Sequence, residues 1–483
     1  MKRKLLSVLL TAVMTLSCTF ALAACNDAPI ADSGDPVVTP DDDSDTPGGN
    51  EQHEHTYTSV VTTQPTCTQE GVMTYTCTCG DSYTQAIPTI AHSYVNGVCI
   101  MCSEHEPTEG LVFTLSGNGT EYAVTDYTSV ATEVYIPATY EGLPVTGIGY
   151  GAFMDCRYLT SITIPDSVTS IGASAFMDCQ NLTSITIPSS VTSIGGNTFY
   201  GCSSLTSIMI PQGVTSIEIR AFSSCSSLTS ITIPDSVVSI GTDAFSGCSV
   251  LQAVYISDME AWCNIQIGYG NANPLMYAHD LYLDGELVTD LVVPENVTNI
   301  GWGAFNGCSS LTSVAIPDSV TSIGQYAFQD CINLTCINIP DSVTSIGDCA
   351  FWSCSNLDCL IIGKSVTSIG ERTFYNCSSL ASITVANNNP VYHSVGNCII
   401  ETESKTLILS GCKNSVIPTD GSISSIGEYA FTNCSELTSI TIPECVTRIG
   451  EWAFGGCSNL VSVIFEDTEG WYVTYAGGST ISI

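Results

Sequence analysis

The chain has 483 residues, of which 44% are hydrophobic and only 12% are charged. Its 10 Lys and Arg residues, against 47 Asp and Glu residues, give a formal net charge of −37. One ordinary core does not support this length, so several domains or an elongated repeat array are expected. A surface so poor in cations repels phosphate backbones and anionic lipid headgroups, which argues against nucleic acid as a partner.

Residues 1–24 have the pattern of an export signal, because basic residues at positions 2–4 precede an apolar stretch that ends in small residues. The sequence LAAC at residues 22–25 resembles the lipobox of bacterial lipoproteins, in which the cysteine is lipidated and becomes the mature N-terminus. The resemblance implies acyl chains on Cys25 that hold an exported protein on the outer face of a bacterial membrane, at the cell surface. A plain secretory signal cut after Ala24 is the alternative.

The stretch from residue 25 to residue 52 combines this lipidated cysteine with an acidic tether. Residues 26–52 are rich in Pro, Gly, Ser and acidic side chains and contain no Lys or Arg. Such a segment cannot bury a core, so we expect a disordered, solvated spacer. Contact with the membrane is expected only through the lipid anchor.

Residues 53–106 are expected to form a small β-rich module with clustered Cys and His residues. The pairs Cys77-Thr-Cys79 and Cys99-Ile-Met-Cys102 each offer two soft ligands from one turn, and two such pairs commonly make one tetrahedral zinc site. We predict a zinc-ribbon-like module in which zinc has a structural role, and no other cofactor. The candidate ligands are His55, Cys67, Cys77, Cys79, His92, Cys99 and Cys102. A disulfide-stapled module is the alternative, since an exported chain meets an oxidising milieu and a domain this short has little core.

Residues 111–147 alternate apolar and polar positions around Gly-Asn-Gly, which predicts a hairpin-like cap for the array that follows. From residue 148 to residue 483 the chain repeats one phrase, most clearly LTSITIPDSVTSIGASAFMDCQN at residues 159–181. The repeat cysteines recur every 23 residues within each block, and this period indicates a solenoid. They are Cys156, Cys179, Cys202, Cys225, Cys248, Cys308, Cys331, Cys354, Cys377, Cys434 and Cys457.

Each repeat is interpreted as one coil. Two isoleucines alternate inward on a short strand, and the proline after them turns the chain. The Ala-Phe-x-x-Cys segment predicts a short helical or 3₁₀ return whose Phe fills the core, with the cysteines as buried, unpaired thiols. The predicted fold class is therefore a β-rich α+β solenoid, a leucine-rich repeat array of 23-residue coils with a parallel sheet along one face, preceded by the small β-rich Cys/His module.

The motifs LTSITIP, SVTSIG and AFxxC resemble those of the BspA-type leucine-rich repeat family of bacterial surface proteins, and they run from about residue 111 to the end. The resemblance implies a protein-binding or adhesion role, with host extracellular-matrix proteins or other cells as targets. A glycan partner is also left open.

Two longer, irregular coils interrupt the period at residues 249–299 and 378–425, and a C-terminal cap is expected from about residue 458. Aromatic residues in these coils supply large contact area at low entropic cost, so they are candidate ligand contacts, although core packing explains them equally well. They are Tyr255, Trp262, Tyr269, Tyr277, Tyr282 and Tyr392.

The array offers no recognisable catalytic motif. His279 and His393 are its only histidines, and neither lies in a nucleophile, metalloprotease or phosphate-binding pattern. We predict a cell-surface binding or adhesion protein and no enzyme. A structural scaffold of the envelope, or a lipoprotein that captures a ligand, is the alternative.

Overall fold

The computed structural model describes residues 55–95, 97–102, 105–413, 415–467, 469, 472–474 and 480–482. The predicted leader, Cys25 and the acidic tether lie outside the described residues. The chain divides into two units, one made of the residues up to 64 and 71–87, the other of residues 65–70 and the residues from 88 onward.

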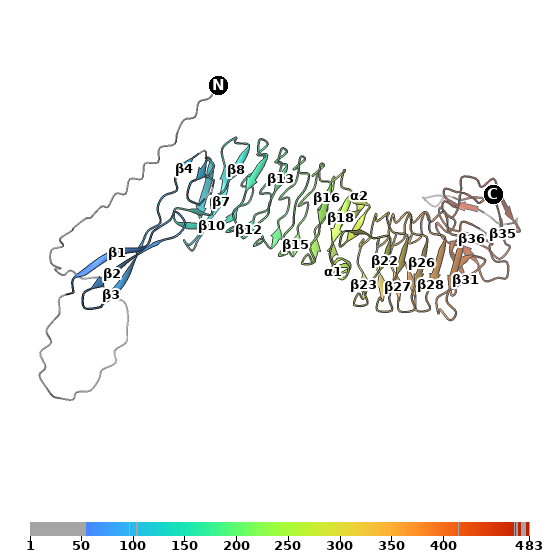
Figure 1. Ribbon diagram of the computed structural model, residues 1–483. Coiled ribbons are helices and arrows are strands. Elements are labelled where there is room, and N and C mark those ends of the chain that lie inside the picture. Colours follow the sequence, from blue (N-terminus) through green and yellow to red (C-terminus); the bar gives the residue numbers. More distant parts are fainter. Residues whose placement is uncertain are drawn as a thin grey trace, which may run out of the picture. The chain divides into compact units, whose positions relative to one another are not determined.

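The first unit is an antiparallel three-stranded sheet. Its strands are β1 (Tyr57–Thr63), β2 (Gly71–Cys77) and β3 (Ser82–Ile87), with β2 in the centre (Figure 1). The strands are rich in Thr, Tyr and Val, which favour extended backbone. Tyr75 and Tyr83, opposite each other on β2 and β3, stack with ring centroids 4.7 Å apart.

The second unit begins with a short hairpin and a cap and continues as a solenoid. The hairpin consists of β4 (Tyr94–Val95) and β5 (Val98–Cys99). The cap strands are β6 (Leu111–Leu115), β7 (Tyr122–Tyr127), β8 (Glu133–Tyr135), β9 (Thr139–Tyr140) and β10 (Leu143–Ile148). Strand β6 pairs with β7 in antiparallel fashion, and β7 then pairs with β10 in parallel, so the cap converts a hairpin into the first rung of the array.

The coils stack through two parallel strand ladders, one more than the sequence predicts (Figure 1). The first ladder comes from the LTSITIP segments: β8, β11 (Ser161–Thr163), β13 (Ser184–Ile185), β16 (Ser230–Thr232), β18 (Ala253–Ile256), β20 (Leu281–Leu283), β22 (Asp290–Val292), β24 (Ser313–Ala315), β26 (Cys336–Ile339), β28 (Cys359–Ile362), β30 (Ser382–Val385), β35 (Ser439–Ile442) and β37 (Ser462–Phe465). Their isoleucines pair in register, as Ile162 does with Ile185.

The second ladder comes mainly from the Ser-Ile dipeptide of SVTSIG, whose extended backbone also bonds to its neighbours. Its strands are β10, β12 (Ser170–Ile171), β14 (Ser193–Ile194), β15 (Ser216–Ile217), β17 (Ser239–Ile240), β19 (Gln266–Ile267), β23 (Asn299–Ile300), β25 (Ser322–Ile323), β27 (Ser345–Ile346), β29 (Ser368–Ile369), β33 (Thr406–Ser410), β34 (Ser425–Ile426) and β36 (Arg448–Ile449).

The remaining elements lie in the irregular coils and near the C-terminus. They are α1 (Met259–Asn264), α2 (Leu275–Ala278), β21 (Glu286–Leu287), β31 (Tyr392–Val395), β32 (Cys398–Glu401), β38 (Tyr472–Thr474) and β39 (Thr480–Ser482). In the described part of the chain, no helix has the length and apolar character that crossing a bilayer requires.

The Ala-Phe-x-x-Cys segment is not a helical or 3₁₀ return, so that expectation is wrong. Ser174 and Asp178 have left-handed backbone, with φ of 57° and 58°, which aims alternate N–H groups out of the coil. The N–H groups of Ser174, Phe176 and Asp178 donate to the carbonyls of Gly196, Thr198 and Tyr200 in the next coil, at 2.9, 2.9 and 2.7 Å. We call this third set of bonds between coils the turn ladder.

The core runs inside the coils, where a column of phenylalanines stacks from one coil to the next. Phe153, Phe176 and Phe199 are buried, with neighbouring ring centroids 5.4 and 5.6 Å apart. The repeat cysteines line the same core. The thiol of Cys202 is fully buried and donates to the carbonyl of Phe176 at 3.2 Å, and burial raises its pKa to about 12.

Most repeat cysteines are thus unpaired thiols, as expected, but Cys434 is an exception. It forms a disulfide with Cys412, a residue of the second irregular coil. The reason is local, because the coil before Cys434 brings a cysteine from outside the repeat against it. The prediction of an unpaired thiol at this position is therefore wrong.

The left-handed turns give a stability prediction at Ser224, whose φ is 63°. A β-branched side chain is disfavoured in this conformation, so Ser224→Val should lower the free energy of unfolding by about 1–2 kcal/mol. Ser224→Gly should change it by less than about 0.5 kcal/mol, since glycine adopts positive φ without strain. Urea denaturation measures both variants.

Ser207→Val is the matched control, because Ser207 is exposed and has no positive φ. It should stay within about 0.5 kcal/mol of the unchanged protein. Equal effects of valine at positions 207 and 224 would contradict a role for backbone handedness.

Candidate functional sites

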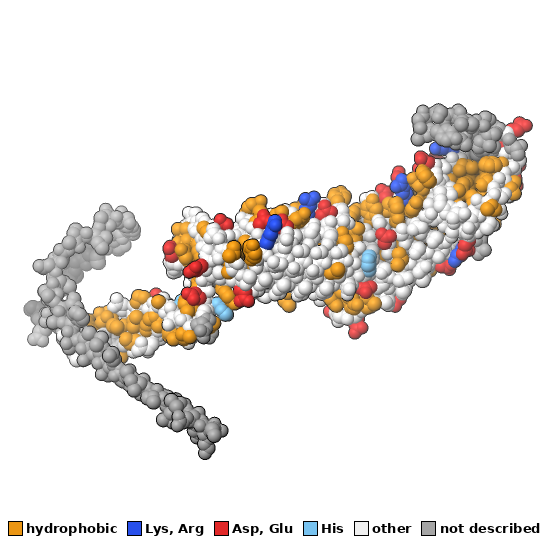
Figure 2. Space-filling model, turned by 90° about the horizontal axis from the view of Figure 1, so that it is seen from above, with side chains coloured by type: hydrophobic (Ala, Val, Ile, Leu, Met, Phe, Trp, Pro, Cys, Tyr) orange, Lys and Arg blue, Asp and Glu red, His pale blue; other side chains and the backbone are white. Residues whose placement is uncertain are grey.

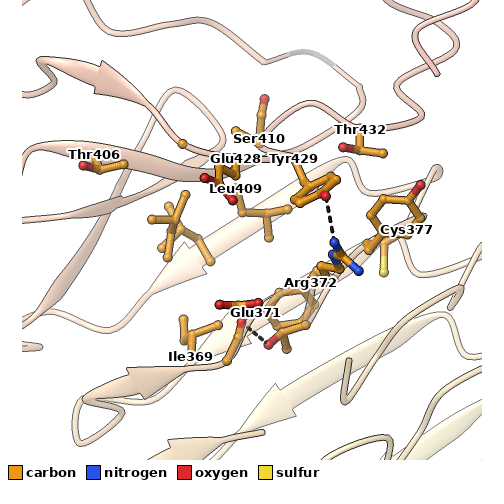
Figure 3. Close-up of a pocket in the computed structure, with 18 of the residues that line it drawn as sticks. Ile369, Glu371, Arg372, Cys377, Thr406, Leu409, Ser410, Glu428, Tyr429 and Thr432 are labelled. Atoms are coloured by element: carbon orange, nitrogen blue, oxygen red, sulfur yellow. Dashed lines mark hydrogen bonds between the residues drawn. The ribbon is translucent and has the colours of Figure 1, made fainter. Parts of the chain in front are cut away.

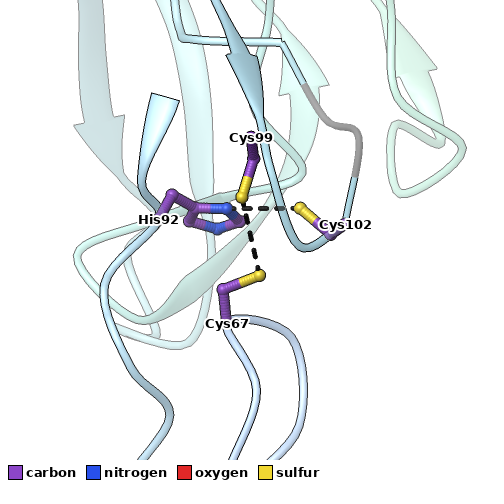
Figure 4. A group of neighbouring side chains, drawn as sticks. All are labelled: Cys67, His92, Cys99 and Cys102. Carbon is purple, nitrogen blue, oxygen red and sulfur yellow. Dashed lines mark hydrogen bonds between the residues drawn. The ribbon is translucent and has the colours of Figure 1, made fainter. Parts of the chain in front are cut away.

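Four of the predicted metal ligands form one compact group in the second unit (Figure 4). Cys67 lies in the loop that follows β1, His92 precedes β4, Cys99 ends β5, and Cys102 lies in the turn after it. Their ligand atoms all lie within 4.8 Å of one another. The Sγ atoms of Cys67 and Cys99 are 3.8 Å apart, and Cys102 Sγ is 3.3 Å from His92 Nδ1.

These distances suit a tetrahedral metal ion. With metal–sulfur bonds of about 2.3 Å, the edge between two sulfur ligands of a tetrahedron is roughly 3.8 Å. Cys67 and Cys99 are buried, so the group is closed to bulk water on that side. The backbone N–H groups of Cys102 and Met101 lower the pKa of Cys99 to about 5, whereas desolvation raises the pKa of Cys67 to about 12.

The other three predicted ligands form a separate group within the first unit. His55, Cys77 and Cys79 have their ligand atoms within 4.8 Å of one another, and Cys79 Sγ lies 3.3 Å from His55 Nδ1. Asp81 is next to them, with a carboxylate oxygen 3.9 Å from His55 Nδ1. The sequence spacing predicts one site made from the pairs Cys77/Cys79 and Cys99/Cys102. In the structure each pair belongs to its own group, because Cys67 and His92 complete the second pair.

The first irregular coil uses its predicted contact residues mostly for structure. Trp262, on α1, is only 1% exposed, and its indole N–H donates to the carbonyl of Ala304 at 3.1 Å. Trp262 is therefore a core residue and is withdrawn as a ligand contact. Tyr277 is half-buried, and its hydroxyl accepts a 3.0 Å hydrogen bond from the N–H of Gly247.

Three other aromatic residues of this coil reach the surface to different extents. Tyr255 and Tyr282 are half-buried neighbours on β18 and β20, with ring centroids 4.9 Å apart. Tyr269 is 75% exposed and makes an edge-on contact with Trp302. Tyr269 is thus the best-placed of the predicted contact residues to meet a partner.

This coil also supplies hydrogen-bond partners for the turn ladder of the coils on both sides, a role that the sequence did not predict. Asp243 and Phe245 donate to the carbonyls of Tyr269 and Asn271 at 3.2 and 3.3 Å. On the far side, the buried amide of Asn273 donates to the carbonyl of Gly303 at 2.7 Å, beside the Trp262 bond to Ala304. No pattern in the sequence marks Asn273, because its partner lies 30 residues away.

The second irregular coil leaves a cavity of about 330 Å³, also missed (Figure 3). Tyr392 lines it, but that side chain is 6% exposed and its hydroxyl accepts from the N–H of Ile369 at 3.3 Å. Tyr392 is therefore a structural residue and is withdrawn as an accessible contact. Arg372 reaches Tyr429 at this cavity, donating from Nη2 to the hydroxyl at 2.8 Å.

Charged side chains are sparse on the solenoid, as its composition predicts (Figure 2). His279 and His393, the histidines of the array, serve as local hydrogen-bond partners. His279 Nδ1 lies 3.1 Å from the carbonyl of Gly307, and His393 Nδ1 lies 2.9 Å from Thr402 Oγ1.

Comparison with solved structures found bacterial leucine-rich repeat proteins. A leucine rich cell surface protein from Faecalibacterium prausnitzii is 28% identical, with 75% of this chain and 95% of that chain covered and a TM-score of 0.47. A leucine-rich repeat protein from Bacteroides ovatus is 27% identical, with 74% and 93% covered and a TM-score of 0.39. Comparison with curated proteins found no match.

The family comparison covers most of the solenoid. Residues 146–264, 282–398 and 402–475 match the family described as BspA type Leucine rich repeat region, in 6 copies. The matched ranges start at the end of the cap and leave out residues 265–281 of the first irregular coil and residues 399–401 of the second. Because they make up more than half of the sequence, the chain belongs to the BspA-type leucine-rich repeat family.

Proposed function

We propose that this protein is an exported surface lipoprotein whose solenoid binds another protein and thereby mediates attachment to host matrix or to other cells. The observation that carries the proposal is the solenoid itself. Leucine-rich repeats of this family are protein-interaction modules, and the described surface offers extended strand faces without a catalytic arrangement. The solenoid surface is also suited to bind a glycan carried by the partner.

The anchor and the adhesive role come from the sequence and the family resemblance. The lipobox-like residues 22–25 support attachment of acyl chains to Cys25, and the acidic stretch that follows supports a spacer between membrane and solenoid. A scaffold of the envelope, or a lipoprotein that captures a soluble ligand, has the same anchor and the same solenoid. Attachment to an immobilised partner is the property that separates adhesion from both.

We also propose that the group formed by Cys67, His92, Cys99 and Cys102 holds a structural zinc ion. Three cysteines and one histidine are a common structural zinc set, and all four tetrahedral positions are filled by protein. The ion would tie the loop after β1 to the β4–β5 hairpin, where little apolar core is available. The three-residue group at His55 would leave one tetrahedral position for a further ligand.

The zinc proposal predicts about one zinc ion per chain at the four-residue group, measured by mass spectrometry of metals in protein purified without chelator. Cys102→Ser should lose that ion and make residues 65–102 more sensitive to proteolysis, because the hairpin loses its cross-link. Cys336→Ser, at a half-buried cysteine of the solenoid, is the control and should keep the zinc content. A Cys67–Cys99 disulfide in the purified protein would contradict the proposal.

The adhesion proposal predicts that cells carrying the protein attach to at least one immobilised matrix protein more strongly than cells that lack it. Tyr269→Ala should weaken that attachment by about fivefold or more, as expected for an exposed aromatic contact. Tyr158→Ala is the matched control, since Tyr158 is 64% exposed and lies outside the irregular coils. Unchanged attachment across a broad panel of matrix proteins would count against adhesion and favour a scaffold.

A further inference from the structure

In the described solenoid the backbone bonds of the turn ladder are interrupted at both irregular coils. At the first, buried side chains donate to the backbone carbonyls of Gly303 and Ala304 instead. The second interruption lies between the coil of residues 369–377 and the coil of residues 427–433. In the coil just before, three N–H groups donate to the next coil in the regular way: Cys349 to Glu371 at 3.0 Å, Phe351 to Thr373 at 2.9 Å and Ser353 to Tyr375 at 2.8 Å. The equivalent donors one coil later are the N–H groups of Arg372, Phe374 and Asn376. None of these three has a hydrogen-bond acceptor among the described residues.

On the other side of the break, carbonyl groups of residues 428–432 lack their regular backbone donors. In the regular pattern the carbonyls of Glu428, Ala430 and Thr432 would accept from these donors. Ala430 instead accepts from the N–H of Ser410 at 2.8 Å, and no described N–H group donates to the carbonyls of Glu428 and Thr432. The break thus has three N–H groups without a partner on one side, and on the other the carbonyls of Glu428 and Thr432 without a backbone donor among the described residues.

Side chains, not backbones, meet across the break. Asn433 Nδ2 donates to Asn376 Oδ1 at 3.0 Å, and Arg372 donates to Tyr429, whose ring also lies 4.7 Å from the guanidinium carbon (Figure 3). The space between the two coils is the 330 Å³ cavity, which reaches the core. Phe374 is 6% exposed there, whereas Phe351 in the preceding coil is fully buried.

The strands show the same interruption. Strand β29 ends its sheet, and the next sheet along the chain starts with β31, so one edge of β29 has no neighbouring strand; the N–H of Ile369 on β29 donates to the hydroxyl of Tyr392 instead. Open strand edges pair readily with extended segments of other chains. At the first irregular coil the equivalent gap is closed by the chain itself, through Asn273 and Trp262.

We infer that this slot, lined by residues 369–377 on one side, 427–432 on the other and residues 392–412 of the second irregular coil between them, binds an extended segment of a partner protein that carries a basic side chain. The segment would complete the turn ladder with its own carbonyl and N–H groups. Glu371, Glu401 and Glu428 line the cavity, while the one arginine there is already held by Tyr429. The negative charge of the whole chain favours the same partner. This inference deepens the proposed function by naming the chemistry of the partner.

The inference is tested on the full protein by fluorescence anisotropy. The probes are labelled, acetylated pentapeptides in which valine alternates with lysine, arginine or glutamate. We expect a basic peptide to bind saturably and its glutamate analogue to bind more weakly. N-methylation of alternate backbone nitrogens should lower the affinity by about tenfold, since each methyl removes a main-chain hydrogen bond. Binding should also slow amide exchange over residues 369–377.

The double variant E371Q/E428Q should weaken binding of the basic peptide by about fivefold to tenfold at low salt, with little effect on stability. The control is E451Q, because Glu451 occupies the same position as Glu428 one coil later and does not line the cavity. The inference would be overturned if neither basic peptide bound saturably, or if the N-methylated analogue bound as tightly as the unmodified peptide. Amide exchange over residues 369–377 that stays unchanged on binding would also overturn it. Cell attachment is measured separately, so this result would leave the proposed function in place.

Discussion

The solenoid depends on one constraint, the pairing of each coil's backbone groups with those of the next coil. A coil of this size cannot satisfy its own N–H and C=O groups, so three ladders of hydrogen bonds carry them to the neighbours. Even the outward threonines take part. Thr206 Oγ1 donates to the carbonyl of Thr183 at 3.3 Å, and Thr229 Oγ1 to that of Thr206 at 3.2 Å. The fixed repeat length follows, because one residue more or less would shift every ladder at once.

The two irregular coils show what happens when the repeat length changes. The first inserts two short helices and supplies Asn273 and Trp262 as substitute donors, so the ladder is closed by side chains. The second inserts the hairpin of β31 and β32, and its core divides at β32: Ile399 packs with the preceding coils, whereas Cys398 and Ile400 pack with the following ones. Strand β32 thus packs against the coils on both sides, but it supplies no backbone partners for the turn ladder.

The period, the inward isoleucines and the stacked phenylalanines could be predicted because they repeat. The sequence also carries a signal for the left-handed turns. The residue before each repeat cysteine is Asp, Asn, Ser or Gly, as at Asp155, Asp178, Ser224 and Asn376, and all of these have positive φ. These residue types tolerate left-handed backbone best, so the pattern indicates turns and argues against the helical return that was expected.

The sites were harder to predict because their partners are distant in sequence and follow no period. Cys67 completes a group with Cys99 and Cys102, although Cys67 and Cys99 are 32 residues apart in the sequence. The C-x-C spacing at Cys77 instead favours a site that combines Cys77 and Cys79 with Cys99 and Cys102, and this combination is wrong. Aromatic character predicts Trp262 and Tyr392 as ligand contacts, but in an irregular coil a large side chain is needed first to fill the core.

The position of the slot matters for recognition as well as for stability. A regular face repeats the same Ser and Thr pattern every 23 residues, so a partner displaced by one coil would meet nearly the same surface. The break in the turn ladder between residues 377 and 427 differs from the one at the first irregular coil, where Asn273 and Trp262 donate to the carbonyls of Gly303 and Ala304. A segment seated in the slot would fix the register of the partner along the whole solenoid. The regular coils would then supply area, while the irregular coil would supply specificity.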